Sequence, residues 1–249
     1  MTEVTERRNF YGRIRGKTLR ASQKTYLAEG LEPLSLPSVT REANPSRAAI
    51  DLTFTGGRPL WLEIGFGGGE HLIWQAVRHP DVTLIGCEPF EDGVVKVLTA
   101  IEEQNLGNIR LRGDDVRPLL RALPPQSIDR AFVLFPDPWP KRKHVKRRLV
   151  SKPLLDLLAR VLRPGAELRI ATDIGDYLRT MLIALMAHPD FAWAAARPGD
   201  WRVRPDDWPE TRYEQKALRE GRRGYFLRFR RRGCSENCQN HVAIPVMIA

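Results

Sequence analysis

The stretch "LWLEIGFGGGEHL", Leu60–Leu72, gives the clearest indication of a fold in this sequence. It begins with "LWLEI", Leu60–Ile64, a short apolar run of the kind that forms buried strands. Gly65, Gly67 and Gly69 follow, allowing a tight turn and a close approach of a ligand to the backbone, and a helix-like run comes next. A strand, a glycine turn and a helix form the first unit of doubly wound α/β sheets, which bind ligands at the carboxyl ends of their strands.

The alternation of strands and helices continues along the chain. Apolar runs predict further strands at Val82–Cys87, Ile109–Arg112, Arg130–Phe135, Glu167–Thr172, Phe191–Ala195 and Tyr225–Arg230. Helical patterns between them cover a run from Glu70, Phe90–Gln104, Leu154–Leu162 and Asp176–Ala187. We therefore expect an α/β fold with a doubly wound, mostly parallel seven-stranded sheet and helices on both faces.

The charge balance points to a polyanionic partner. Lys and Arg total 40 against 30 acids among 249 residues, which gives a net charge of +10 and an isoelectric point near 9.9. Such a surplus is typical of proteins that bind nucleic acid, although a basic soluble protein without such a partner is the alternative.

The sequence gives no sign of a membrane or secreted protein. The longest apolar runs, such as "MLIALMA" (Met181–Ala187), are far shorter than the ~20 residues that a bilayer span needs. The first residues, "MTEVTERRNF", lack the apolar core of a secretory signal, and three cysteines make no disulfide framework. We expect a cytoplasmic protein.

Both ends of the chain differ from its centre. Residues 1–55 are expected to form a basic, partly flexible arm, since Arg7–Lys24 holds seven basic residues and no acid, with Phe10 and Tyr11 interleaved. This composition suits phosphate contact and base stacking; a solvated, poorly ordered terminus is the alternative. The main domain is expected at 56–232.

Residues 233–249 form a tail to which we assign no role. Its Cys234, Cys238 and His241 are spaced like possible metal ligands. A structural zinc site normally needs four ligands, and no fourth is evident, so we expect no metal.

Acids at successive strand ends indicate the kind of ligand. A dinucleotide fingerprint counted from Gly65 would need a glycine at position 70, where Glu70 stands and would oppose a phosphate. Glu63 suits a cationic ligand, and Glu88, after the second strand, suits two ribose hydroxyls. Asp114 or Asp115 closes the third strand, near an adenine. These features fit S-adenosylmethionine, which carries an ammonium and a sulfonium but no phosphate; turn-forming glycines and acids without a ligand are the alternative.

A second stretch, "FPDPWPKRKHVKRRL" (Phe135–Leu149), places an acid beside a basic run. Prolines on either side of Asp137 fix φ and hold the acid on stiff backbone, which favours a site over a linker. Trp139 could stack on a base, and the run Lys141–Arg148 suits an RNA backbone. The alternatives are a proline-rich turn that caps the sheet and a solvated basic face.

With "ATD" and "TRYEQKA" added to these motifs, the sequence resembles the bacterial tRNA (guanine-N7-)-methyltransferases of the TrmB type. The similarity runs from about "RRNFYGRIRGK" to "YFLRFRR". It implies a class I methyltransferase (Rossmann-like) fold. It also implies methyl transfer from S-adenosyl-L-methionine to N7 of the variable-loop guanine of tRNA, position 46 in the usual tRNA count.

The resemblance assigns roles residue by residue. It implies cofactor binding by Glu63, Gly65, Gly67, Glu88, Asp114 and Asp137, of which Asp137 is also the catalytic residue. It implies substrate binding by Lys141, Asp173, Thr211, Arg212, Tyr213 and Glu214. It implies RNA binding by Lys143, His144, Val145, Lys146, Arg147 and Arg148, although many relatives have a second histidine where this chain has Val145.

The chemistry needs no general base, because N7 of guanine carries a lone pair and no proton. Methylation makes the purine cationic, so a carboxylate that accepts from guanine N1–H and N2–H would stabilise the growing charge and select guanine over adenine. Asp137 or Asp173 could do this. The expected partner is tRNA, and the expected assembly is a monomer or homodimer.

Two other functions remain open at this point. One is another S-adenosylmethionine-dependent RNA methyltransferase, such as an amino-adenine methylase. Those enzymes have two consecutive prolines between an acid or Asn and an aromatic residue, whereas here only Pro138 separates Asp137 from Trp139. The other is a non-enzymatic RNA-binding protein, which would have no use for the acids at the strand ends.

Overall fold

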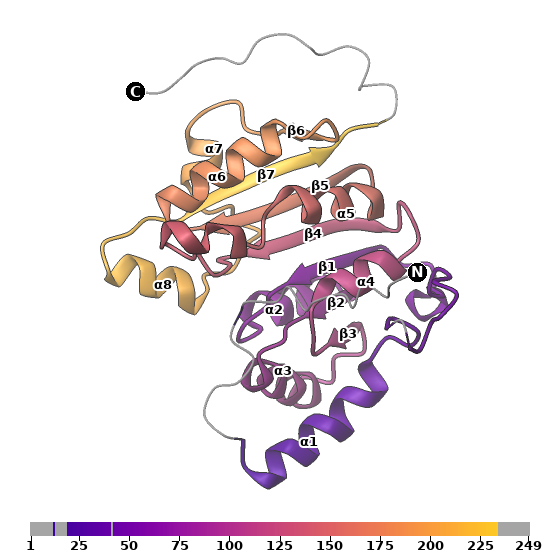
Figure 1. Cartoon of the computed structure of the whole chain (residues 1–249). Coiled ribbons are helices and arrows are strands. Elements are labelled where there is room, and N and C mark those ends of the chain that lie inside the picture. The colour runs from indigo at the N-terminus through magenta and orange to yellow at the C-terminus, as the bar shows by residue number, and fades with distance from the viewer. Residues whose placement is uncertain (1–11, 13–18, 41, 234–249) are drawn as a thin grey trace.

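The computed structural model describes residue 12 and residues 19–40 and 42–233, which form the predicted seven-stranded sheet (Figure 1). The order is β3-β2-β1-β4-β5-β7-β6. The strands are β1 (Leu60–Ile64), β2 (Thr83–Cys87), β3 (Ile109–Arg112), β4 (Ile128–Leu134), β5 (Leu162–Thr172), β6 (Phe191–Trp193) and β7 (Tyr225–Arg231). Strands β1 to β5 pair in parallel and β7 is antiparallel to β5 and β6, so the doubly wound, mostly parallel sheet is confirmed.

Helices cover both faces of the sheet, as the sequence predicts. They are α1 (Ala21–Leu31), α2 (Glu70–Arg78), α3 (Glu91–Glu103), α4 (Val116–Ala122), α5 (Lys152–Val161), α6 (Gly175–Met186), α7 (Gly199–Arg202) and α8 (Arg212–Arg219). Short 3-10 turns lie at η1 (Glu32–Leu34), η2 (Thr53–Thr55) and η3 (Arg142–Arg147). No described helix meets the length and apolarity that crossing a membrane would require.

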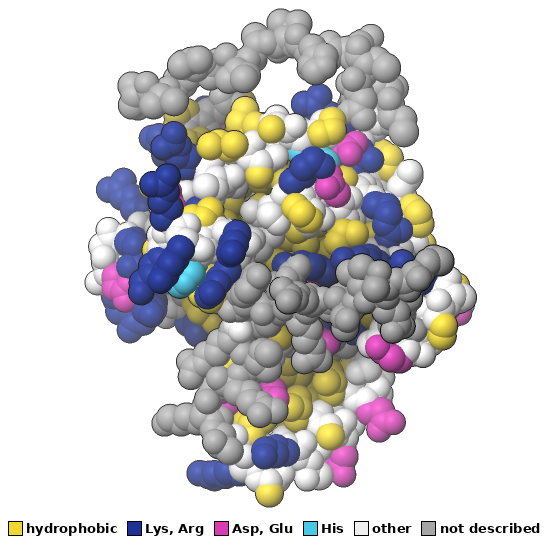
Figure 2. All heavy atoms as spheres, viewed as in Figure 1, with side chains coloured by type: hydrophobic (Ala, Val, Ile, Leu, Met, Phe, Trp, Pro, Cys, Tyr) yellow, Lys and Arg dark blue, Asp and Glu magenta, His cyan; other side chains and the backbone are white. Residues whose placement is uncertain are grey.

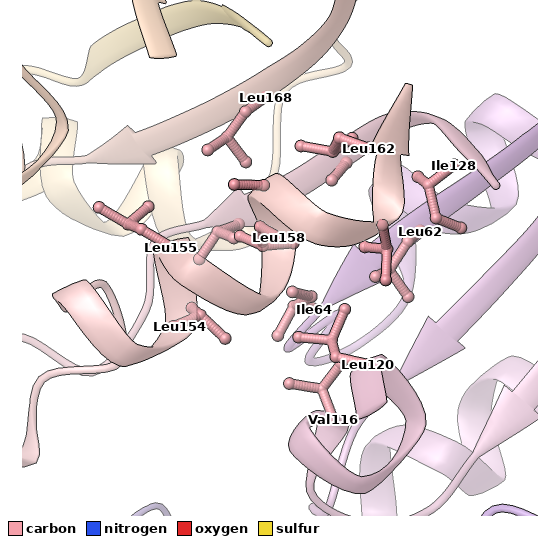
Figure 3. Close-up of a cluster of buried hydrophobic side chains, with 14 of the residues drawn as sticks. Leu62, Ile64, Val116, Leu120, Ile128, Leu154, Leu155, Leu158, Leu162 and Leu168 are labelled. Atoms are coloured by element: carbon pink, nitrogen blue, oxygen red, sulfur yellow. The ribbon is translucent and has the colours of Figure 1, made fainter. Parts of the chain in front are cut away.

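Strand alternation divides the core into two apolar clusters. Leu62 and Ile64 of β1 pack with residues of α4 and α5, including Val116 and Leu158 (Figure 3). Trp61 points to the opposite face and belongs to the cluster formed by α2 and α3. Because successive residues of a strand face opposite sides, this arrangement fixes which β1 side chains lie beneath α2.

The described part of the N-terminal segment packs against the main domain. Helix α1 lies on α3, where the Tyr26 hydroxyl donates a 2.8 Å hydrogen bond to Glu102. Leu36 and Ile50 are buried in the same cluster as α4 and α5. Most of the basic stretch Arg7–Lys24 lies outside the described residues, so the arm and its boundary stay predictions.

The prediction that the C-terminal tail binds no metal is also untested, because Cys234, Cys238 and His241 lie outside the described residues. Among residues 12, 19–40 and 42–233, no group of three or more His, Cys, Asp or Glu side chains could hold a metal ion.

Candidate active site

A cavity of about 310 Å³ opens at the carboxyl ends of β1, β2 and β4. Six of the predicted site residues line it: Gly65, Gly67, Glu88, Asp137, Arg147 and Tyr213. Gly12, Arg117 and Trp139 also line it. The remaining predicted residues, Glu63, Asp114, Lys141, Lys143, His144, Val145, Lys146, Arg148, Asp173, Thr211, Arg212 and Glu214, are not among its lining residues. The cavity lies where doubly wound sheets bind their ligands.

The glycine turn forms one wall, and α8 lies directly on it. Gly67 has φ +56°, and a Cβ at this position would lie 2.7 Å from the Tyr213 hydroxyl oxygen. A Cβ on Gly68 would overlap the guanidinium of Arg212, which pairs with Glu70. Side chains are therefore excluded on the turn, both by its backbone conformation and by the first turn of α8.

Glu88 holds the turn from the second strand. Its carboxylate accepts hydrogen bonds from the backbone N–H of Gly67 at 2.7 Å and of Phe90 at 2.9 Å. Burial raises the pKa of this carboxyl above its ordinary value. A carboxylate has about four lone-pair positions, so two hydrogen bonds leave capacity for further donors from a ligand in the cavity.

Asp137 sits on unusual backbone after β4. Phe135 and Trp139 on either side have φ +48° and +42°, a region that bulky residues rarely adopt. Asp137 is exposed and lines the cavity. The surrounding protein partly desolvates its carboxyl group, which raises the pKa of Asp137 above its ordinary value. Within the described part of the chain, no ion-pair partner is found for it. Strained backbone of this kind persists only where surrounding contacts hold it, and it is common at active sites.

The ring of Trp139 contacts the basic run that follows it. Its ring meets the His144 ring edge to face at 5.7 Å, and the Arg147 guanidinium lies 4.9 Å from its centroid. Such aromatic and cation–π contacts each add a fraction of a kcal/mol to about 2 kcal/mol. The predicted base-stacking residue is thus engaged with its own chain on at least two sides.

Glu63 points away from the cavity, toward α2. Its carboxylate lies 2.7 Å from Nδ1 of His71, and both side chains are at most 3% exposed. The other ring nitrogen of His71 lies 3.1 Å from the Gln75 amide nitrogen, which also donates to the Asp207 carbonyl at 3.1 Å. A neutral His71 protonated at Nδ1 satisfies all these contacts. His71 was not among the residues predicted from the sequence, although it stands in the same motif, eight residues after Glu63.

The two acids after β3 have different environments: Asp115 caps a helix and Asp114 is exposed. Asp115 accepts a 2.8 Å hydrogen bond from the Arg117 N–H and caps α4. Asp114 is half exposed, accepts from the Asp115 N–H at 2.7 Å and lies 3.4 Å from Arg112. Of the two alternatives, Asp114 has the freer carboxylate, and its cofactor role stays a prediction.

Of Asp173 and the "TRYE" motif, Thr211–Glu214, only Tyr213 lines the cavity. Asp173 follows β5 and accepts a 2.7 Å bond from Nε of Arg222, a residue that the sequence analysis missed. Thr211 caps α8 by accepting from the Glu214 N–H at 3.3 Å. Glu214 is buried, which raises its pKa, and its carboxylate binds Arg204 at 3.1 Å. The motif therefore builds α8, and the pattern T-x-x-E, typical of helix starts, could have predicted it.

The basic run is divided between surface and interior. Lys141, Lys143 and Lys146 are exposed, whereas Arg148 is only 5% exposed. Figure 2 shows Lys and Arg side chains gathered on the left of this face, where Figure 1 places α8 and the neighbouring turns. Exposed cations that gather beside a cavity suit a polyanion backbone.

Known proteins are similar to this chain in sequence, and others are similar in fold. A family model described as a putative methyltransferase matches residues 57–227. A tRNA (guanine-N(7)-)-methyltransferase from Ruegeria pomeroyi is 54% identical over 90% of this chain and 95% of its own length. One from Roseobacter denitrificans is 52% identical over 89% and 95%. The crystal structure of the 16S rRNA methyltransferase KamB, 18% identical, aligns with a TM-score of 0.52 over 73% of this chain and 92% of that chain, which shows a shared fold.

Proposed function

The chain belongs to the tRNA (guanine-N(7)-)-methyltransferase family, and we propose that it transfers a methyl group from S-adenosyl-L-methionine to N7 of the variable-loop guanine of tRNA, position 46. The identity of 54% over 90% of the chain carries this proposal. Cytoplasmic location and a monomeric or homodimeric state stay predictions from the sequence.

The residues around the cavity fit the cofactor. Its volume of about 310 Å³ is at the lower end of ligand pockets, which hold about 300–1,000 Å³. Glu88 offers a buried carboxylate to hydroxyl donors, and the bare backbone of Gly65 and Gly67 allows close approach. The carboxylates of Glu88 and Asp137 suit a ligand that carries positive charge. S-adenosylmethionine supplies an activated methyl group when bound here.

Asp137 is the carboxylate best suited to the guanine. It lines the cavity, and its stiff backbone fixes its direction. An ionised carboxylate accepts from guanine N1–H and N2–H and stabilises the positive charge that the purine acquires. Adenine presents no such pair of donors, so the same contact gives base selectivity. Asp173 is the second candidate, although it is already paired with Arg222.

The exposed cations are suited to the tRNA backbone. Lys141, Lys143 and Lys146 project from the segment that follows Asp137, and phosphate contacts there would guide the RNA toward the cavity. We extend the proposal to Arg212 and Tyr213, because both lie over the glycine turn at the cavity.

One experiment tests the function against its rivals. Unmodified tRNA is incubated with the protein and S-adenosylmethionine, digested, and its nucleosides are identified by mass spectrometry. We expect N7-methylguanosine, about one per tRNA, and none when the variable-loop guanine is replaced by adenine. A methylated adenine would indicate another RNA methyltransferase. Binding of tRNA without any methylated product would indicate a non-enzymatic RNA-binding protein.

A further inference from the structure

Arg148 is the last residue of the basic run, but its side chain is buried whereas the lysines of the run are exposed. Its side chain is 4% exposed, whereas Lys146, two residues earlier, is exposed. A buried guanidinium presents little charge to a phosphate, so the role of Arg148 has to be sought in what it contacts inside the protein.

The contacts of Arg148 join the loop after β4 to helix α6. Its Nε–H donates to the carbonyl oxygen of Pro138 at 2.9 Å. Its Nη1 donates to the hydroxyl of Thr180 at 2.9 Å, and its Nη2 pairs with the carboxylate of Asp176. The guanidinium also lies 4.9 Å from the centroid of the Tyr177 ring. One planar group thereby links the loop after β4 to the first turns of α6.

A candidate catalytic acid lies next to each of the two linked segments. Pro138 follows Asp137 directly, and α6 begins two residues after Asp173. Pro138 has no N–H, so its carbonyl is the main-chain group through which a hydrogen bond can fix that residue. The flanking φ angles of +48° at Phe135 and +42° at Trp139 need such external support to persist.

We propose that Arg148 is a positioning residue for methyl transfer, which ties the Asp137 loop to the start of α6 and so sets the placement of Asp137 relative to Asp173. The inference rests on the proposed function, since it assumes that these acids act on the guanine. Arginine suits the task because its rigid fork of five donors reaches three partners at once, which a lysine ammonium does not reproduce.

The rival role is a direct contact of Arg148 with an RNA phosphate, and the two roles differ in measurable ways. Loss of a phosphate contact weakens tRNA binding, lowers the slope of log K against log salt by about 1, and is largely repaired by lysine. Loss of positioning lowers the rate at saturating tRNA, leaves the salt slope unchanged, and is not repaired by lysine.

The test compares Arg148→Lys and Thr180→Val with Lys146→Ala in the full-length protein. For each variant we would measure the tRNA Kd at several salt concentrations, the single-turnover rate at saturating tRNA, and hydrogen exchange in residues 135–149. We expect Arg148→Lys to lose at least tenfold in rate, with Kd within twofold, an unchanged slope and faster exchange in 135–149. Thr180→Val should change rate and exchange in the same direction by less. Lys146→Ala should instead raise Kd and lower the slope.

One result would overturn the proposal: an Arg148→Lys protein that keeps the wild-type rate, which is the outcome expected if Arg148 makes a phosphate contact that lysine repairs. If Arg148→Lys does not fold, Thr180→Val and Asp176→Asn decide, and wild-type rate and exchange in both would count against the inference. A wild-type protein that makes no N7-methylguanosine would contradict the proposed function, whereas equal rates in wild type and Arg148→Lys would contradict this inference alone.

Discussion

Nδ1 of His71 lies 2.7 Å from the carboxylate of Glu63, and both side chains are almost completely buried beneath α2. The glycine turn separates the two residues in sequence, so the pair closes the turn across its base. The chain of contacts continues through Gln75 to the Asp207 carbonyl, in the segment that leads to α8. One polar network therefore supports the turn from below, while Tyr213 and Arg212 of α8 cover it from above.

The first prediction concerns this pair. His71→Leu leaves the buried Glu63 carboxylate without its hydrogen-bond donor, and a buried acceptor left unsatisfied costs about 1–3 kcal/mol or more. We expect the free energy of unfolding, measured by urea denaturation, to fall by about this amount. The double variant Glu63→Leu, His71→Leu should recover much of the loss, because neither polar group then remains unpaired. A His71→Leu protein as stable as the wild type would contradict the prediction.

The second prediction concerns the charge of Asp137. Replacing it by Asn should lower the single-turnover rate by about 30–150-fold, equivalent to about 2–3 kcal/mol of transition-state stabilisation. In the wild type, the rate should rise with pH as Asp137 ionises, above the ordinary range of an aspartate, since loss of solvent raises its pKa.

The same pKa shift fixes the sign of the effect on stability. A carboxyl whose pKa is higher in the folded state binds its proton more tightly there, so its contribution to stability falls as pH rises through that pKa. At pH 7 the charged Asp137 therefore opposes folding. We expect Asp137→Asn to have an unfolding free energy equal to or above that of the wild type at pH 7, despite its lower rate. A variant that loses both stability and rate would indicate a structural role instead.

The third prediction separates backbone strain from contact at the glycine turn. Gly67→Ala adds a Cβ 2.7 Å from the Tyr213 hydroxyl at φ +56°. Gly57→Ala is the matched control, with φ +79° and open space around the added atom. Both should lose about 1 kcal/mol or more of stability through the backbone. In calorimetry, only Gly67→Ala should also weaken S-adenosylmethionine binding, by at least tenfold, and equal affinities in the two variants would argue against contact at this wall.

Much of the fold could be predicted, because apolar runs and turn residues are local signals. Strand β3 matches its expected range, Ile109–Arg112, and β2 starts one residue later than expected, at Thr83. The region after α5 differs: the strand was expected from Glu167, whereas β5 begins at Leu162, directly after α5, and includes the "RPG" stretch. Ile128 of β4 pairs with Leu162, but Arg130 pairs with Glu167, so the register shifts and β5 contains more residues than β4 here. A pattern of apolar residues does not reveal an irregularity of this kind.

The sequence predicts which residues lie near the candidate site better than it predicts where their side chains point. Glu88 and Asp137 line the cavity because both follow parallel strands, which a sequence pattern can indicate. Glu63 turns under α2 because its position on β1 shares a face with Trp61, which depends on how the sheet is covered. The burial of Arg148 depends on Asp176, 28 residues away, so a basic run alone could not distinguish it from its neighbours.

The fourth prediction concerns salt dependence. Replacing the exposed Lys141 or Lys143 by Ala should weaken tRNA binding and reduce the slope of log K against log salt by about 1 each, as expected for lost phosphate contacts. Arg163→Ala is the control, since Arg163 lies at the amino end of β5, away from the cavity, and pairs with Asp129. Equal slopes in all three variants would show that the tRNA approaches another face.

The fifth prediction concerns Asp173 and Arg222, whose side chains are joined by a 2.7 Å hydrogen bond. Arg222 also pairs with Glu220, so it holds Asp173 to the end of α8. Asp137 has no comparable ion pair in the described residues, which favours Asp137 for the base and Asp173 for joining α8 to β5.

If the pair acts as one unit, Asp173→Asn and Arg222→Met should each lower kcat/KM, and the double variant should lower it little further. Residues in contact typically show such coupling, about 0.5–3 kcal/mol, in a double-mutant cycle. The cycle would be measured with unmodified tRNA, with tRNA Kd determined in parallel so that loss of binding can be separated from loss of rate. Additive effects would show that Asp173 acts on the substrate independently of Arg222. Asp173 would then be as good a candidate as Asp137 for accepting hydrogen bonds from the guanine.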